Sequence, residues 1–150
     1  MGGGVDHESF HSIQTDATDE ILSQNNIDHY YIYDYTSRPK LVLAGSFDFS
    51  YYHNIEITFY EVSFISCPGG VFSIECFRLA NDKELEMLKS VSYRFIEGPV
   101  ICMEDQTFGT RFFIAAENLD YELKTVFYYK RENLQPHESV AEWAGKDGKV

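Results

Sequence analysis

Short apolar stretches separated by turn residues run through the chain from Lys40 onward, and this pattern constrains the fold more than any other feature. Ile55, Ile57 and Phe59 lie at every second position, the period of a strand with one buried face. A Pro-Gly-Gly turn at 68–70 joins this stretch to the next one in a predicted hairpin. We therefore predict about seven antiparallel strands, forming either a sandwich or a partly open barrel.

The expected core consists of apolar side chains in these strands. In residues 41–52 the second half alternates, so Phe47 and Phe49 are expected to point inward. The alternation shifts by one position after Phe59, which predicts a β-bulge near residues 60–61. The complete set of predicted core residues is Phe47, Phe49, Ile57, Phe59, Phe64, Phe77, Phe112, Ile114 and Phe127.

One helix is well marked by the residues at its start. Asn81 suits an N-cap and Glu84 follows three residues later, the spacing at which two side chains bond reciprocally to the first turn. Apolar residues then recur on one face, which predicts a short helix over 82–91. A thinner pattern predicts a second helix over 16–24. Strands do not alternate with helices, so the fold class is mainly β, or β-rich α+β, rather than parallel α/β.

Length and composition fit one domain. The chain has 150 residues, and 44% of them are hydrophobic, near the average of globular proteins. The segment 1–37 contains seven acidic residues and neither lysine nor arginine. We expect residues 1–26 to form a flexible acidic arm, residues 27–143 a single β-rich domain, and residues 144–150 a frayed tail.

The acidic charge bears directly on the partners. Aspartate and glutamate number 24 against 12 lysines and arginines, a formal net charge of −12. Binding to nucleic acid or to an anionic membrane requires clustered basic residues, so neither is expected. A basic protein partner suits this charge. The cysteines form no CxxC pair, and no apolar stretch resembles a signal peptide or a membrane span, so a cytoplasmic location is expected.

Two motifs suggest chemistry at first sight. Residues 7–11 (HESFH) match the HExxH zinc pattern, but no apolar helical stripe supports them, so we interpret the match as chance. Cys67 precedes Pro68 at a predicted strand end, yet its spacing links it to neither His53 nor His137. Phosphate-binding loops and the serine-hydrolase motif are absent from the sequence. The sequence therefore predicts no catalytic residue, no metal and no other cofactor.

A binding surface is expected near the turn at residues 51–54. Adjacent tyrosines in a strand place one ring away from the core, and exposed tyrosine is common at protein interfaces. Continued alternation sends Tyr51 inward and Tyr52 outward, unless the turn has already begun, and it also sends Glu56 outward beside the turn. The predicted binding residues are Tyr51, Tyr52, His53, Glu56, Glu104 and Asp105.

Two functions of different classes are open at this point. The first is a non-catalytic interaction protein, in its most concrete form an acidic, immunity-type neutraliser of a basic partner protein. The second is a small-ligand-binding protein or an enzyme with an aromatic-lined pocket inside a β-barrel or curved sheet. Acidity, abundant aromatics and the lack of a catalytic motif favour the first. The oligomeric state is not specified by any pattern in the sequence.

Overall fold

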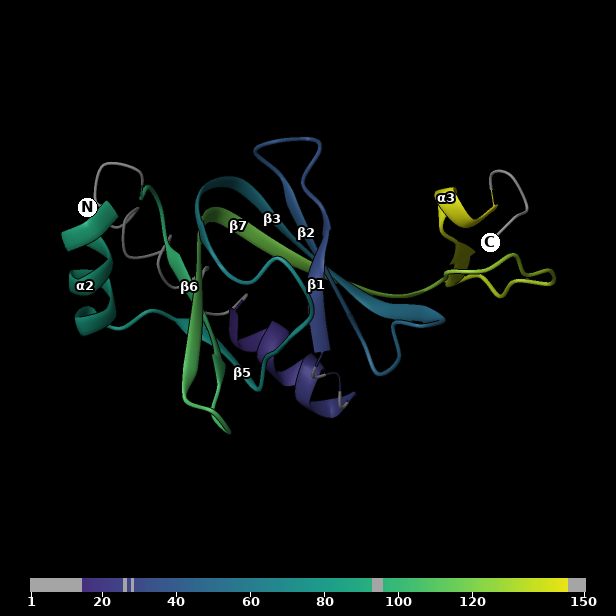
Figure 1. Cartoon of the computed structure of the whole chain (residues 1–150), viewed down its shortest axis with the longest axis horizontal. Helices are drawn as coiled ribbons and strands as arrows, with labels where there is room; N and C mark the ends of the chain where they lie inside the picture. Colours follow the sequence, from purple (N-terminus) through teal and green to yellow (C-terminus); the bar gives the residue numbers. More distant parts are fainter. Residues whose placement is uncertain (1–14, 26, 28, 93–95, 146–150) are drawn as a thin grey trace.

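The part of the chain that the structure describes is built around one curled sheet of eight strands (Figure 1). This computed structural model describes residues 15–25, 27, 29–92 and 96–145. In chain order the strands are β1 (His29–Asp34), β2 (Leu41–Ser46), β3 (Tyr52–Ser66), β4 (Phe72–Ser73), β5 (Cys76–Leu79), β6 (Val100–Asp105), β7 (Thr110–Phe127) and β8 (Glu138–Val140).

Seven of these strands form the main path of the sheet, in the order β4-β1-β2-β3-β7-β6-β5. Every neighbouring pair on this path is antiparallel, whereas the short β8 lies parallel to the end of β7. The two edge strands, β4 and β5, are separated by only two residues of chain, so the sheet curls toward closure. The predicted mainly β fold with a partly open barrel is confirmed, and the sandwich alternative is not the one that forms.

The inner face of the curled sheet carries the main core. Ile55, Ile57 and Phe59 point to this face from β3 with no exposed surface, as their two-residue spacing predicts. Residues 15–24 form a helix, close to the prediction of 16–24, and Leu22 from this helix packs into the same core. Four of the predicted core residues belong to this cluster: Ile57, Phe59, Phe77 and Ile114.

The helix over 15–24 is also tied to the edge of the sheet, because Asp19 Oδ1 accepts a hydrogen bond from Phe77 N at 2.7 Å. These residues therefore pack with the domain rather than extending from it as part of an acidic arm. Residues 1–14 and 146–150 lie outside the described residues, and with them the HESFH motif and most of the expected tail.

The predicted helix at 82–91 is confirmed as α2 (Asp82–Ser92), which covers the outer face of β6 and β7. Its predicted capping box is present: Glu84 N donates to Asn81 Oδ1 and Asn81 N donates to Glu84 Oε1, each at 2.9 Å. Leu88 packs with Cys102 and Phe113 beneath the helix. The short helix α3 (Glu142–Gly145) follows β8 at the far end of the sheet.

The prediction that Phe47 and Phe49 lie in the main core is wrong. β2 ends at Ser46, and a turn follows in which Asp48 Oδ1 accepts a hydrogen bond from Ser50 N at 3.0 Å. Asp48 favours such turns because its side chain bonds the backbone two residues on. Phe47 is consequently 55% exposed, while Phe49 packs into a separate small cluster under α3.

Three further predicted core residues lie at its margins. Phe64 is half-buried against the cluster under α2, and Phe112 only flanks the main core. Phe127 is buried, but among the rings of Tyr52 and Tyr129 near the end of β7. α2 packs on the outer face of β6 and β7, and α3 packs near the end of β7, so buried apolar residues gather in three clusters rather than in a single core.

Two shifts in the pairing between β3 and β7 change which side chains of β3 face inward. The pairing with β7 shifts between Val62 and Phe64, and Glu61 has a positive φ of 53°, close to the predicted bulge at 60–61. The second shift, between His53 and Ile55, has no counterpart in the sequence pattern. It changes the facing of the first two residues of β3, and this change shapes the candidate site.

Candidate functional site

The structure divides the predicted surface near residues 51–54 between two faces. Tyr51 lies in the turn before β3 and is 58% exposed, so the turn has already begun at this residue and the alternative to an inward position is the one that forms. Tyr52 is half-buried and its ring contacts Phe127 edge-on, with the ring centroids 6.5 Å apart. His53, the next residue, points to the opposite face of the strand, where Glu56 also lies.

The two predicted acids on β6 do not join this surface. Glu104 pairs across the sheet with Arg111 near the start of β7, whereas Tyr52 pairs with Phe127, sixteen residues further along β7. Asp105 is almost fully buried, and its carboxylate accepts a hydrogen bond from Thr107 N at 3.1 Å in the β6–β7 turn. The predicted set is therefore not one site.

Glu104 belongs instead to a charge cluster beneath α2. Arg78 forms two hydrogen bonds to the buried carboxylate of Glu84, at 2.7 and 2.9 Å, and Arg111 adds a third at 2.9 Å. Glu104 lies 3.6 Å from Arg78 and 4.0 Å from Arg111. Two arginines thus meet two carboxylates, and the cluster fixes α2 to the sheet without leaving net charge.

His53 is the centre of a hydrogen-bonded chain on the outer face. Its Nε2 lies 2.8 Å from Glu56 Oε2, and its Nδ1 lies 2.6 Å from the Tyr128 hydroxyl. The Tyr128 hydroxyl in turn lies 2.9 Å from the hydroxyl of Tyr31 on β1. Lys124 completes the chain through an ion pair with Glu56 at 3.3 Å. Three strands of the sheet are therefore linked through polar side chains.

The pairing shift between His53 and Ile55 allows this hydrogen-bonded network to form. In a regular strand, residues three apart point to opposite faces. At this shift two residues of β7, 124 and 125, stand opposite Asn54 alone, and His53 lies on the face of Glu56, so an i,i+3 pair can hydrogen-bond. A sequence pattern could not show this bulge, because residues 51–56 contain no break in the spacing of their apolar residues.

Burial and hydrogen bonding set the charge states of Glu56, Tyr128 and Tyr31 in this network. Burial disfavours the Glu56 carboxylate, but the His53 hydrogen bond and the Lys124 charge outweigh it and lower the pKa of Glu56. Burial raises the pKa of Tyr128 and of Tyr31, so both hydroxyls keep their protons. An ionised Glu56 accepts a hydrogen bond from His53 Nε2.

The carboxylate–imidazole–hydroxyl order resembles that of acid–base enzymes, but its setting differs from theirs. His53 has no exposed surface, and Tyr128 is almost fully buried beneath Trp143, with the two ring centroids 5.3 Å apart. A general base must come within hydrogen-bond reach of its substrate. In this arrangement, side chains of the protein itself occupy both ring nitrogens of His53, and the network links β1, β3 and the end of β7 on the outer face.

Between the regions covered by α2 and by α3, the outer face of β3 and β7 is open to solvent. Cross-strand pairs place Glu56 opposite Glu122, Thr58 opposite Asp120, and Tyr60 opposite Asn118. We call these six residues, together with Lys124, the outer strip. Most of their side chains are exposed or half-exposed. Sequence analysis identified only Glu56 among them, although the alternation of polar residues at 56, 58 and 60 carried the signal.

The strip is acidic. Lys124 Nζ lies 3.3 Å from Glu56 Oε1 and 3.8 Å from Glu122 Oε1, so one lysine forms ion pairs with two carboxylates. Asp120 is exposed, and one of its oxygens accepts a hydrogen bond from Tyr121 N at 2.8 Å. Tyr60 presents a ring that is 41% exposed on the same face. The strip therefore offers acceptor oxygens and an aromatic face to a cationic partner.

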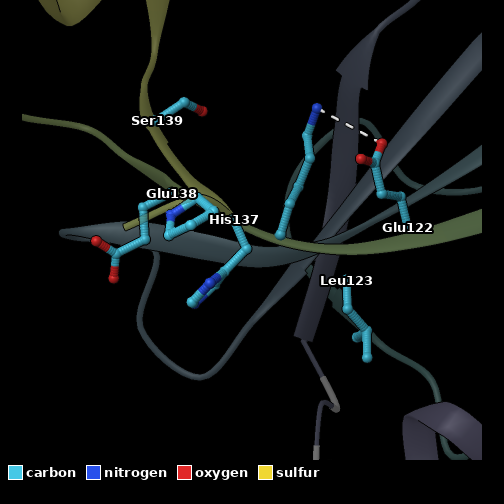
Figure 2. A pocket seen from close by; sticks show the side chains of 7 residues that line it. Glu122, Leu123, His137, Glu138 and Ser139 are labelled. Atoms are coloured by element: carbon cyan, nitrogen blue, oxygen red, sulfur yellow. Dashed lines mark ion pairs between the residues drawn. The ribbon is translucent and has the colours of Figure 1, made fainter. Parts of the chain in front are cut away.

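An open hollow of about 480 Å³ lies at one end of the strip, between β7 and the chain leading into β8 (Figure 2). Its lining side chains do not converge: Glu122 and Leu123 point to opposite sides of β7. The dashed line in Figure 2 marks the ion pair between Lys124 and Glu122. No phenylalanine, tyrosine or tryptophan lines this hollow or a second one beside α2.

Cys67, the one candidate nucleophile, packs against the main core. Burial raises the pKa of its thiol to about 11, so it is protonated at neutral pH. No group of three or more histidine, cysteine or acidic side chains within the described ranges is arranged to hold a metal ion. None of the helices in those same ranges is both long enough and apolar enough to cross a membrane.

Comparison with known proteins adds no relative. No protein family, no curated protein and no solved structure matches this chain. Three polar features of the described residues are candidates for a functional site: the strip, the His53 network and the charge cluster under α2. Of these three, the strip has the most exposed polar groups, although Arg111 of the charge cluster is also exposed.

Proposed function

We propose that this chain is a non-catalytic interaction protein whose outer strip binds a basic protein partner, in the manner of an immunity-type neutraliser. The observation that supports this most is the open sheet face between two covered ends. On that face, the outer strip contains three carboxylates and only one lysine, so it carries excess negative charge.

Electrostatics gives this face two roles. A chain with a net charge of −12 attracts basic proteins over a distance, and this attraction speeds encounter. The strip then supplies local complementarity, because exposed carboxylates pair with lysine or arginine and suppress acidic competitors. The β3–β7 pairing is the longest in the sheet, so the strip is held on a rigid surface and loses little entropy on binding.

The alternative of an aromatic-lined ligand pocket has less support from the structure. The inner face of the curled sheet is filled by the main core and by the helix over 15–24. The two hollows described above are open and lined largely by polar and charged side chains. No observation on the described residues favours a buried small-molecule site over a protein-binding face.

The proposal is tested by binding of a hexalysine peptide, measured by titration calorimetry at low salt. Asp120→Lys removes one attractive charge from the strip and adds a repulsive one, so we expect affinity to fall about fivefold. Glu20→Lys is the matched control: it makes the same charge change at an exposed acid on the helix over 15–24, against the other face of the sheet. Equal losses for the two variants would contradict the proposal, because they would show attraction by net charge alone.

A further inference from the structure

Within the outer strip, the carboxylates differ in how far they are already engaged. Glu56 is bound by His53 and Lys124, and Lys124 also lies near Glu122. Among the described residues, no cation pairs with Asp120, whose only hydrogen bond there comes from the backbone N–H of Tyr121. Asp120 is therefore the carboxylate of the strip that is most available to an incoming cation.

Tyr60 is the aromatic neighbour of that carboxylate. Thr58 lies opposite Asp120 and Tyr60 lies opposite Asn118, so Tyr60 and Asp120 are diagonal neighbours on the same face. Diagonal neighbours in an antiparallel pair lie roughly 7–8 Å apart, within reach of long side chains. A planar cation resting on the ring of Tyr60 can thus place its edge against Asp120.

Arginine fits this geometry better than lysine does. A guanidinium offers a flat face for stacking and a fork of donors for a carboxylate at the same time, whereas an ammonium is a compact, strongly hydrated charge. Within the chain itself, one arginine combines ring stacking with a hydrogen bond, in that case to a hydroxyl group rather than a carboxylate. The Arg131 guanidinium lies 4.3 Å from the centre of the Phe127 ring while donating to the Tyr129 hydroxyl at 2.9 Å.

We infer that the outer strip recognises an arginine side chain of its partner, stacked on Tyr60 and hydrogen-bonded to Asp120. This inference rests on the proposed function, because it specifies which basic side chain the open face accepts. It also explains how a flat sheet face gains specificity: the carboxylate fixes the charge, and the ring beside it selects a planar donor.

The test compares hexa-arginine and hexalysine peptides on the full chain and on three variants. Tyr60→Leu removes the aromatic face, so we expect the preference for hexa-arginine to fall about threefold. Tyr60→Phe keeps the face and should keep the preference. Asp120→Asn should weaken both peptides, and hexa-arginine more than hexalysine, because the bidentate pair is lost.

The outcomes separate this inference from the proposed function. If both peptides bind, and both respond to Asp120→Lys while the arginine preference is unchanged in Tyr60→Leu, the arginine inference is wrong and the basic-partner proposal stands. If neither peptide responds to Asp120→Lys beyond the Glu20→Lys control, both are wrong. Tyr60 is exposed and belongs to no core cluster, so an unchanged melting temperature should accompany each Tyr60 variant.

Discussion

Replacing Glu84 by glutamine should destabilise the protein by about 2–3 kcal/mol at neutral pH. Hydrogen bonds from Arg78, opposed by burial and helped by Asn81 and Arg111, lower the pKa of Glu84 from 4.5 to about 2. At about 1.4 kcal/mol for each pKa unit, this shift corresponds to roughly 3.5 kcal/mol. The expected loss of about 2–3 kcal/mol is set below this value because Arg111 is 48% exposed, and water screens its attraction to Glu84.

The sign of the pH dependence follows from the lowered pKa. The Glu84 carboxylate is ionised in the folded chain down to about pH 2, but in the unfolded chain it takes up its proton near pH 4.5. Its contribution to stability is therefore complete above about pH 5 and is lost as the pH falls toward 2. Glu84→Gln removes that contribution, so the gap between wild type and variant should narrow over the same interval.

Urea unfolding followed by circular dichroism, from neutral pH down to the lowest pH at which the chain still folds, measures this gap. Glu86→Gln is the control, because Glu86 is exposed on the same helix and forms no ion pair within the described residues. A gap below about 0.5 kcal/mol at neutral pH, or a gap that does not change with pH, would refute the view that the buried charge cluster fixes α2.

Three further predictions concern stability in urea. Tyr128→Phe removes the hydroxyl between His53 and Tyr31, so we expect a loss of about 1–2 kcal/mol; an unchanged midpoint would mean that the network contributes nothing. Leu22→Ala should cost about 2–4 kcal/mol if the helix over 15–24 is part of the core, and almost nothing if that helix is detached. Phe59→Ala should cost about 3–5 kcal/mol, but Phe47→Ala under about 0.5, and similar losses for the two would contradict the assigned end of β2.

The sequence predicted those elements whose structure depends only on residues close together in the chain. The capping box at Asn81 and Glu84 specified where α2 begins, because both partners of the two hydrogen bonds lie within one turn. The spacing of Ile55 to Phe59 specified the inner face of β3 for the same reason. Many short strands with turn residues between them predicted an antiparallel β fold, but they left the sandwich and the partly open barrel as alternatives.

The features that the sequence did not predict depend on contacts between distant parts of the chain or on a turn that interrupts the strand pattern. Phe47 continues the alternation in sequence, yet Asp48 starts a turn there, and turn chemistry took precedence over the pattern. The acids Glu104 and Asp105 were assigned to a site that needs the other end of β7, and one sequence carries no information about which strand ends meet. The network around His53 depends on a bulge and on partners from β1 and β7, which only the folded sheet brings together.

The most direct test of the central claim is to map where a basic ligand binds on the whole chain. Amide chemical shifts in ¹⁵N-labelled protein can be followed during titration with hexalysine, first at low salt and then at ~0.2 M salt. The account predicts shifts concentrated on residues 56–60 and 118–124, with affinity that falls as salt rises. Shifts spread over the acidic surface without a focus, or centred on the helix over 15–24, would contradict it.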